Sequence, residues 1–289
     1  ALEMVGMGAP ALVLRSMEAA VQKFVQRPEL CSDEAAGVIE RASFALVEYL
    51  DSVLAGKQVS PVALFPQYRA AQALTGAERV HPADLWPVER RFREPDLVVN
   101  GPPLSYGVEA RARLDSAVLR IVKNGDMAAA GDLRDLSLAF AAAQTERQVR
   151  AFWKICAGFF EAFAGGLLVP DVYVKRVASR VLMQYASLAK GDSAVADRLV
   201  QDLLFFCSQA RPAEAGTAPA LQAVRQAFAL DRFKPVDYET PRFGLYDPAL
   251  LAQARKRIAA ATETWSALAG GDRNKLKPAA DQFGLVCDS

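Results

Sequence analysis

Three cationic side chains in the stretch VYVKRVASR, residues 172–180, are the ones best suited to contact a partner. Arg176 and Arg180 are four residues apart, so a helix would bring them onto one face, with Lys175 beside them. Such a face could bind an acidic protein surface. It is more often typical of an ordinary solvated helix, and the sequence leaves both interpretations open. The inward stripe of that helix would be Val174, Val177 and Val181.

The chain has one histidine, His81, which is followed by proline and lies near Glu78 and Asp84. A general base would also need a nucleophile or a metal partner, and the surrounding sequence offers neither. We therefore expect a loop histidine that is satisfied by Glu78 or by the backbone. Phosphate-binding loops of the types GxxxxGK[ST] and GxGxxG are absent from the sequence. We expect no catalytic residue, no cofactor and no metal ion.

The four cysteines are scattered, and no pair has the spacing of metal ligands: Cys31, Cys156, Cys207 and Cys287. Cys156 and Cys207 fall on apolar helical faces. Buried, reduced thiols are the expected state, which fits a cytoplasmic protein.

The charge balance excludes two classes of partner. The chain carries 34 Lys and Arg residues against 33 Asp and Glu residues, which creates no long-range field for nucleic acid or an anionic membrane. Residues 149–169 form the most apolar region, but Arg150, Lys154 and Glu161 interrupt it. We therefore expect no nucleic-acid binding and no membrane insertion.

Apolar residues recur at helical spacing along the chain, and no stretch has a convincing strand pattern. The opening residues 1–7 look like the end of a helix, so we interpret the sequence as a piece of a longer protein. Prolines cluster between residues 77 and 105 and mark a boundary. We expect an all-α protein of two tandem antiparallel bundles with extra C-terminal helices. The predicted parts are a first bundle at 1–76, a linker at 77–105, a second bundle at 106–232, and a C-terminal loop and long helix at 233–289 that pack on the second bundle.

The second bundle should contain one unusually aromatic helix. Thr145–Gln148 has the form of a capping box that would open this helix, and the Gly165–Gly166 pair would end it. The aromatic residues in between are Phe152, Trp153, Phe159, Phe160 and Phe163.

A repeat relates the two predicted bundles. The pattern of Ala42-Ser43, Leu46 and Tyr49 returns 136 residues later as Ala178-Ser179, Leu182 and Tyr185. The same offset places Val13 on Val149, Met17 on Trp153 and Phe24 on Phe160. Matching helix phases favour a duplicated bundle, although chance agreement between Ala-rich amphipathic helices would look similar.

Several phrases carry a resemblance to a known family. ALEMVGMGAP at residues 1–10, LVEYLDSVLAGK at 46–57, PVALFPQYR at 61–69 and HPADLW at 81–86 resemble the N-terminal region of CheA-type hybrid histidine kinases. These kinases belong to the bacterial type IV pilus chemosensory system, which governs twitching motility. The second half, from AFWKICAGFF at 151–160 to DLLFFCSQA at 202–210, resembles the same region and the pilus-regulating FimL proteins.

The resemblance implies bundles like the histidine phosphotransfer (HPt) domains of this family, which expose a histidine in an H-x-x-K-G pattern. The first bundle begins after the place of that pattern, and the equivalent helix of the second bundle, from Asp132 to Phe140, has no histidine. The resemblance thus implies a non-catalytic regulatory or scaffolding region that binds a response regulator or a pilus-regulatory protein. An active phosphotransfer module with its histidine upstream of Ala1 is the alternative. A helical enzyme is a third possibility, which no residue supports.

Overall fold

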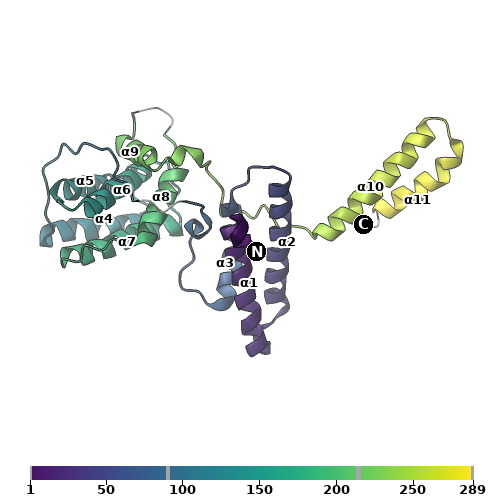
Figure 1. The fold of residues 1–289 in the computed structure, drawn as a ribbon, viewed down its shortest axis with the longest axis horizontal. Coiled ribbons are helices and arrows are strands. Elements are labelled where there is room, and N and C mark those ends of the chain that lie inside the picture. Colours follow the sequence, from purple (N-terminus) through teal and green to yellow (C-terminus); the bar gives the residue numbers. More distant parts are fainter. Residues whose placement is uncertain (1, 89–91, 213–215, 288–289) are drawn as a thin grey trace. The chain divides into compact units, whose positions relative to one another are not determined.

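We describe the protein from a computed structural model, which covers residues 2–88, 92–212 and 216–287. Within these ranges every regular element is a helix, which confirms the predicted all-α class. Contacts divide the chain into two units, and Figure 1 labels their helices. Unit 1 combines Ala1–Val80 with Asp237–Ser289, and unit 2 is His81–Val236.

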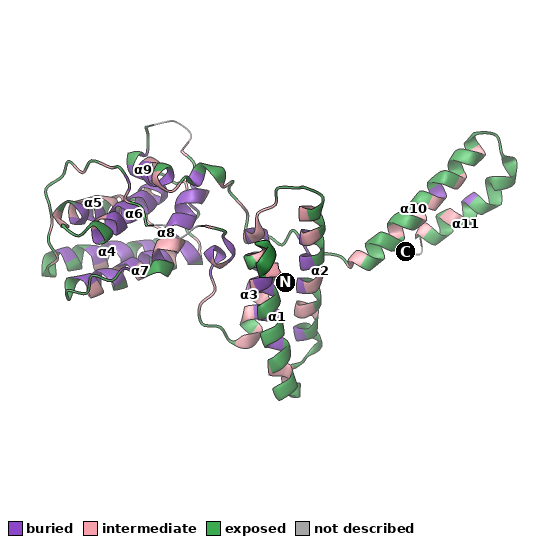
Figure 2. Ribbon diagram, viewed as in Figure 1, coloured by how far each residue is buried: buried purple, intermediate pink, exposed green. Residues whose placement is uncertain are grey.

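Unit 2 is built around α6 (Arg147–Ala164), which α5 (Met127–Ala143), α8 (Asp197–Gln209) and α9 (Pro219–Ala227) all contact. Three neighbours leave α6 little solvent-facing surface beyond its first turn, so most of the helix is purple in Figure 2. The helix α4 (Val108–Asn124) packs on α5 and on α7 (Val172–Ala189). The short helices η4 (Pro82–Leu85) and η5 (Leu230–Arg232) contact α8.

Four aromatic rings pack together at the centre of unit 2. Phe140 of α5 lies 4.8 Å from Trp153 of α6 and 5.3 Å from Tyr185 of α7, measured between ring centroids. Tyr106, just before α4, completes the group and accepts a 2.7 Å hydrogen bond from the indole nitrogen of Trp153. Because these tilted and edge-on rings come from four parts of the chain, they fix the arrangement of the bundle.

Unit 1 contains a three-helix block and a helical hairpin. The block consists of α1 (Gly8–Gln26), α2 (Asp33–Leu54) and α3 (Phe65–Thr75), with η1 (Leu2–Val5), η2 (Pro28–Leu30) and η3 (Pro61–Leu64) at their ends. Ser32 caps α2 by accepting the Ala35 N–H, as the sequence predicts. The hairpin consists of α10 (Pro248–Ala269) and α11 (Leu276–Cys287), joined through η6 (Arg273–Lys275).

The helix bounds follow the predicted offset. Adding 136 to the bounds of α1, α2 and α3 gives 144–162, 169–190 and 201–211. These ranges agree within four residues with α6, α7 and α8. A duplication requires this agreement.

Two segments differ from the predicted domain bounds. The segment from Tyr238 to Gly244 contacts α2 and α3 rather than the second bundle, because Gln67 donates a 2.6 Å hydrogen bond to the Phe243 carbonyl and Phe243 packs edge-on against Tyr49. Residues 81–105, predicted to be a linker, belong to unit 2 and contact α6 and α8.

The capping box at Thr145–Gln148 is also absent. Glu146 is the residue that precedes α6, and no side chain caps that end. The carbonyls of Gln144 and Thr145 instead accept hydrogen bonds from the Arg150 guanidinium.

Candidate docking surfaces of unit 2

The helix α7 carries the three cationic residues singled out from the sequence. Asp171 caps it by accepting the N–H groups of Tyr173 and Val174, both at 2.8 Å. The stripe of Val174, Val177 and Val181 is buried as predicted. Its burial turns Arg176 outward, where the guanidinium carbon lies 6.0 Å from the Tyr173 ring centroid.

The three cations do not share one environment. Lys175 is half-buried and Arg176 exposed, so both can meet a partner. Arg180 instead donates a 2.7 Å hydrogen bond to Asp202 of α8, whose side chain is 2 % exposed. Arg180 therefore ties α7 to α8, a structural role that the spacing on one helix could not reveal.

The only histidine is part of the same buried group. His81 precedes η4 and is 4 % exposed; its Nδ1 accepts the Ala83 N–H at 3.1 Å and lies 3.3 Å from Asp202 Oδ1. The Asp84 carboxylate accepts the His81 N–H. The backbone partner is the expected one, whereas Asp202, 121 residues away in sequence, could not be predicted.

Aromatic rings enclose the imidazole. The ring centroids of Tyr173, Phe205 and Phe206 lie 5.6, 6.1 and 5.5 Å from that of His81. A histidine that accepts a phosphoryl group must present a ring nitrogen to solvent and to the donor protein. The buried position of His81 does not allow that approach.

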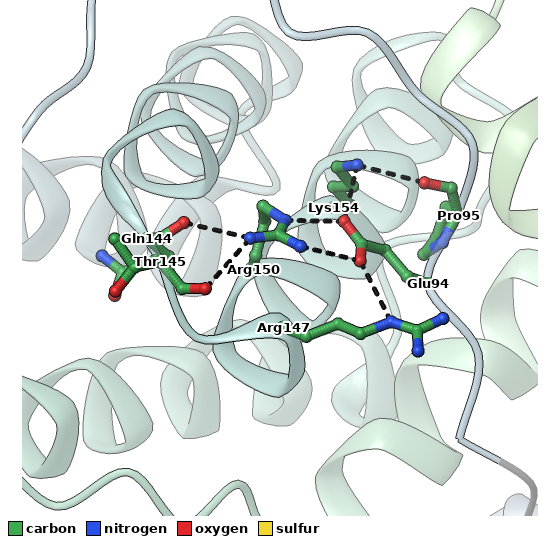
Figure 3. A network of polar contacts seen from close by, with 7 residues as sticks. All are labelled: Glu94, Pro95, Gln144, Thr145, Arg147, Arg150 and Lys154. Carbon is green, nitrogen blue, oxygen red and sulfur yellow. Dashed lines mark hydrogen bonds and ion pairs between the residues drawn. The ribbon is translucent and has the colours of Figure 1, made fainter.

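A second cationic group surrounds Glu94 and was not found from the sequence. Figure 3 shows Arg147, Arg150 and Lys154 of α6 converging on its carboxylate. Arg150 binds both oxygens, at 2.7 and 3.1 Å, and Lys154 binds Oε1 at 2.9 Å. Arg147 lies 3.4 Å from Oε2. We call these four residues the Glu94 cluster.

The Glu94 cluster has three positive charges against one negative charge. The hydrogen bond from Arg150 is the largest cause that lowers the pKa of Glu94 to about 2, and Lys154 adds to it. Arg147 is largely exposed and Lys154 largely buried, so the excess positive charge faces solvent mainly through Arg147. The available sequence signal was the spacing of the three cations by three and four residues along one helix face.

An apolar cavity of about 180 Å³ adjoins the Glu94 cluster. Phe92 forms one wall of this cavity. The guanidinium carbon of Arg147 lies 5.8 Å from the centroid of the Phe92 ring. Phe152 and Ile155 of α6 and Leu204 of α8 form others. The exposed basic rim of Arg147 thus borders an apolar recess.

The described residues contain no group of three or more His, Cys, Asp and Glu side chains placed to hold a metal ion. Over the same residues, no helix has the length and apolar character needed to cross a membrane.

Comparison with known proteins supports part of the sequence resemblance. Residues 100–241 match a family model described as the second domain of the FimL scaffold protein. This range includes α4 to α9. No curated protein and no solved structure matched the chain. The match supports the FimL-like part of the resemblance.

Proposed function

We propose that this chain is a FimL-like, non-catalytic scaffolding or regulatory module of a type IV pilus chemosensory system. The match of residues 100–241 to the second domain of the FimL scaffold protein is the observation that carries the proposal. A scaffold needs stable surfaces rather than a reactive group. The rigid aromatic centre of unit 2 and its two basic surfaces suit that task.

We further propose that the parent protein is a CheA-type hybrid histidine kinase and that this region lies in its cytoplasmic N-terminal part. The phrases HPADLW and LVEYLDSVLAGK support this finer assignment. The alternative is an active phosphotransfer module whose histidine precedes Ala1. Burial of His81 favours the non-catalytic assignment for the residues present.

A phosphotransfer assay separates these possibilities. The chain is incubated with the kinase domain of the system, with a small phosphodonor, and in parallel as a version extended at its N-terminus. We expect no acid-labile label on the present chain. Label that disappears in His81→Ala would contradict the proposal, and label found only on the extended version would establish the alternative.

A binding assay tests the docking role. The probe is the receiver domain of the system's response regulator, an acidic partner of the class proposed. We expect Lys175→Glu with Arg176→Glu to weaken binding at least tenfold and to reduce its dependence on salt, because exposed charges act through screened electrostatics.

The matched control reverses the same amount of charge elsewhere on unit 2. Arg113 and Lys123 are exposed on α4, so Arg113→Glu with Lys123→Glu gives the same change in net charge. Equal weakening by both pairs would show a nonspecific charge effect and would remove α7 as the docking surface.

A further inference from the structure

The C-terminal hairpin of unit 1 resembles the α4–α5 hairpin of unit 2 over five residues of its first helix and at its turn. The residues of α4 from Ala110 to Leu114 read ARARL, and those of α10 from Ala254 to Ile258 read ARKRI. Both hairpins then turn at a Gly-Asp pair. Gly125 and Gly271 have φ angles of 63° and 103°, which favour glycine. The aspartate that follows accepts a backbone N–H in each case, from Ala129 and from Asn274.

The chain enters both hairpins with an aromatic residue followed by a glycine whose N–H is bound by the preceding block of helices. Before α4, Tyr106 packs edge-on against Tyr185 of α7 at 5.1 Å, and the Tyr185 hydroxyl accepts the Gly107 N–H. Before α10, Phe243 packs edge-on against Tyr49 of α2 at 6.0 Å, and Glu48 accepts the Gly244 N–H. Tyr49 and Tyr185 are themselves equivalent under the 136-residue offset.

Equivalent apolar residues are nevertheless buried in one hairpin and exposed in the other. Leu114 and Ile121 of α4 are fully buried against their neighbours. Their counterparts in α10, Ile258 and Trp265, are 51 % and 54 % exposed. Phe283 and Leu285 of α11 are also exposed. The hairpin therefore presents an apolar stripe of the kind that α4 uses for packing.

Within the described residues, no helices cover α1 and α2 of unit 1 as α4 and α5 cover their counterparts in unit 2. In unit 2, α4 covers α7 and α5 covers α6. In unit 1, α1 packs mainly on α3, and its Leu14, Val21 and Val25 stay exposed. Val38 of α2 is half-buried, whereas its counterpart Val174 is buried.

The helices α10 and α2 carry opposite net charge. The helix α10 carries Arg255, Lys256 and Arg257 in succession and a single acidic residue, Glu263. The helix α2 carries one cation, Arg41, against five acidic residues: Asp33, Glu34, Glu40, Glu48 and Asp51. Opposite charge favours approach of α10 to α2.

We propose that the α10–α11 hairpin docks on α1 and α2 of its own chain, as α4–α5 docks on α6 and α7, and so completes the bundle of unit 1. In unit 2, α4 and α5 cover one side of α6 and α7. The docking surface is the corresponding side of α1 and α2. The family match ends at residue 241, before Phe243, so the hairpin lies outside the matched domain. Since Gly244 is already held on α2 and only Leu245, Tyr246 and Asp247 precede α10, the tether keeps the effective concentration of the hairpin high.

A disulfide tests this docking, and its position in unit 1 is chosen from a contact between the equivalent segments of unit 2. There, a Cβ atom at Gly166, between α6 and α7, would lie 3.8 Å from Cε of Met127, which follows the turn of the hairpin. The counterparts in unit 1 are Leu30 and Arg273, and Leu30 precedes the exposed Cys31. The variant is Arg273→Cys with Cys287→Ala, which leaves Cys31 as the other exposed thiol.

Under mild oxidation we expect an intramolecular disulfide between Cys31 and the cysteine introduced at position 273. It is detected as a faster-migrating monomer on a non-reducing gel and by mass spectrometry. A covalent dimer would overturn the proposal, because the occupant would then be the hairpin of a second copy. Absence of any disulfide would overturn it too. The control is Glu263→Cys with Cys287→Ala, in which Arg273 is unchanged. It should form no disulfide with Cys31, because the counterpart of Glu263 in unit 2, Leu119, is exposed.

A second variant tests the apolar stripe. Ile258→Asp with Trp265→Asp, added to the cysteine pair, should slow disulfide formation at least tenfold. Hydrogen exchange of α6 in unit 2 should remain unchanged, which shows that the chain is folded. Unchanged disulfide formation would contradict docking through this stripe.

Discussion

Arg180 Nη1 lies 2.7 Å from Oδ2 of Asp202, and this pair joins α7 to α8. The carboxylate is buried and lies close to His81 as well, and Arg180 contributes to the compensation of its charge. Removing one member of an ion pair whose other member stays buried is more costly than losing an exposed contact.

The first prediction follows from this pair. We expect Arg180→Ala to lower the free energy of unfolding by about 1–3 kcal/mol, less than for a fully buried pair because a third of the arginine side chain is exposed. Arg176→Ala should change it by less than ~0.5 kcal/mol. Urea denaturation of both variants measures the difference, and equal stability would show that the Arg180 pair contributes nothing.

The second prediction concerns pH and Glu94. The folded pKa of about 2 lies below the ordinary value of 4.5, so the Glu94 cluster stabilises the fold above that ordinary value. This contribution should be lost as the pH falls from about 4.5 towards 2. In Glu94→Gln, unfolding free energy should be lower near neutral pH, and it should fall less steeply on acidification.

The comparison variant is Glu109→Gln, at an exposed position of α4. It should leave the pH profile of stability unchanged in chemical denaturation followed by circular dichroism. If Glu94→Gln has the same profile as the unmodified chain, the carboxylate is not stabilised by its three cations.

Helix positions could be predicted because they depend on local spacing. The valine stripe of α7 and the start of α2 at Ser32 are both determined by neighbouring residues, and both are confirmed. The partners of His81 and Glu94 could not be predicted, because they depend on how distant helices pack. Asp202 and Arg150 lie 121 and 56 residues from them in sequence.

The surface of α7 shows the same limit within a single helix. Spacing alone put Arg176 and Arg180 on one face, which is correct for a helix. It could not show that α8 reaches Arg180 but leaves Arg176 exposed.

The third prediction concerns the thiols. Cys156 and Cys207 are fully buried, and burial raises the pKa of Cys207 to about 12 and that of Cys156 well above its ordinary value. Because the thiolate is the reactive form, neither should react in the folded protein. Cys31 and Cys287 are exposed, contrary to the expectation of buried thiols throughout, and should react at once.

A thiol-specific chromogenic reagent should therefore detect two fast groups in native protein and four in denaturant. Cys31→Ala with Cys287→Ala should abolish the fast phase. Rapid reaction of a third thiol would contradict the burial of α6 or α8.

The last prediction compares two glycines within helices of unit 2. A Cβ atom at Gly158 of α6 would lie 2.8 Å from Val224 Cγ2 and 3.2 Å from the Ala220 carbonyl oxygen of α9. At Gly131 of α5, a Cβ atom would have no neighbour within 4 Å. Alanine is favoured over glycine in a helix by about 1 kcal/mol, so only steric conflict should separate the two sites.

We expect Gly131→Ala to raise the free energy of unfolding by up to about 1 kcal/mol. Gly158→Ala should lower it by about 1–3 kcal/mol, because α9 must move away from α6 to admit the methyl group. Urea denaturation measures both changes. Hydrogen exchange should show faster opening of α9 in Gly158→Ala. Equal stabilisation by both substitutions would mean that α9 does not pack closely on α6, and the scaffold surface built on these helices would then need a different arrangement.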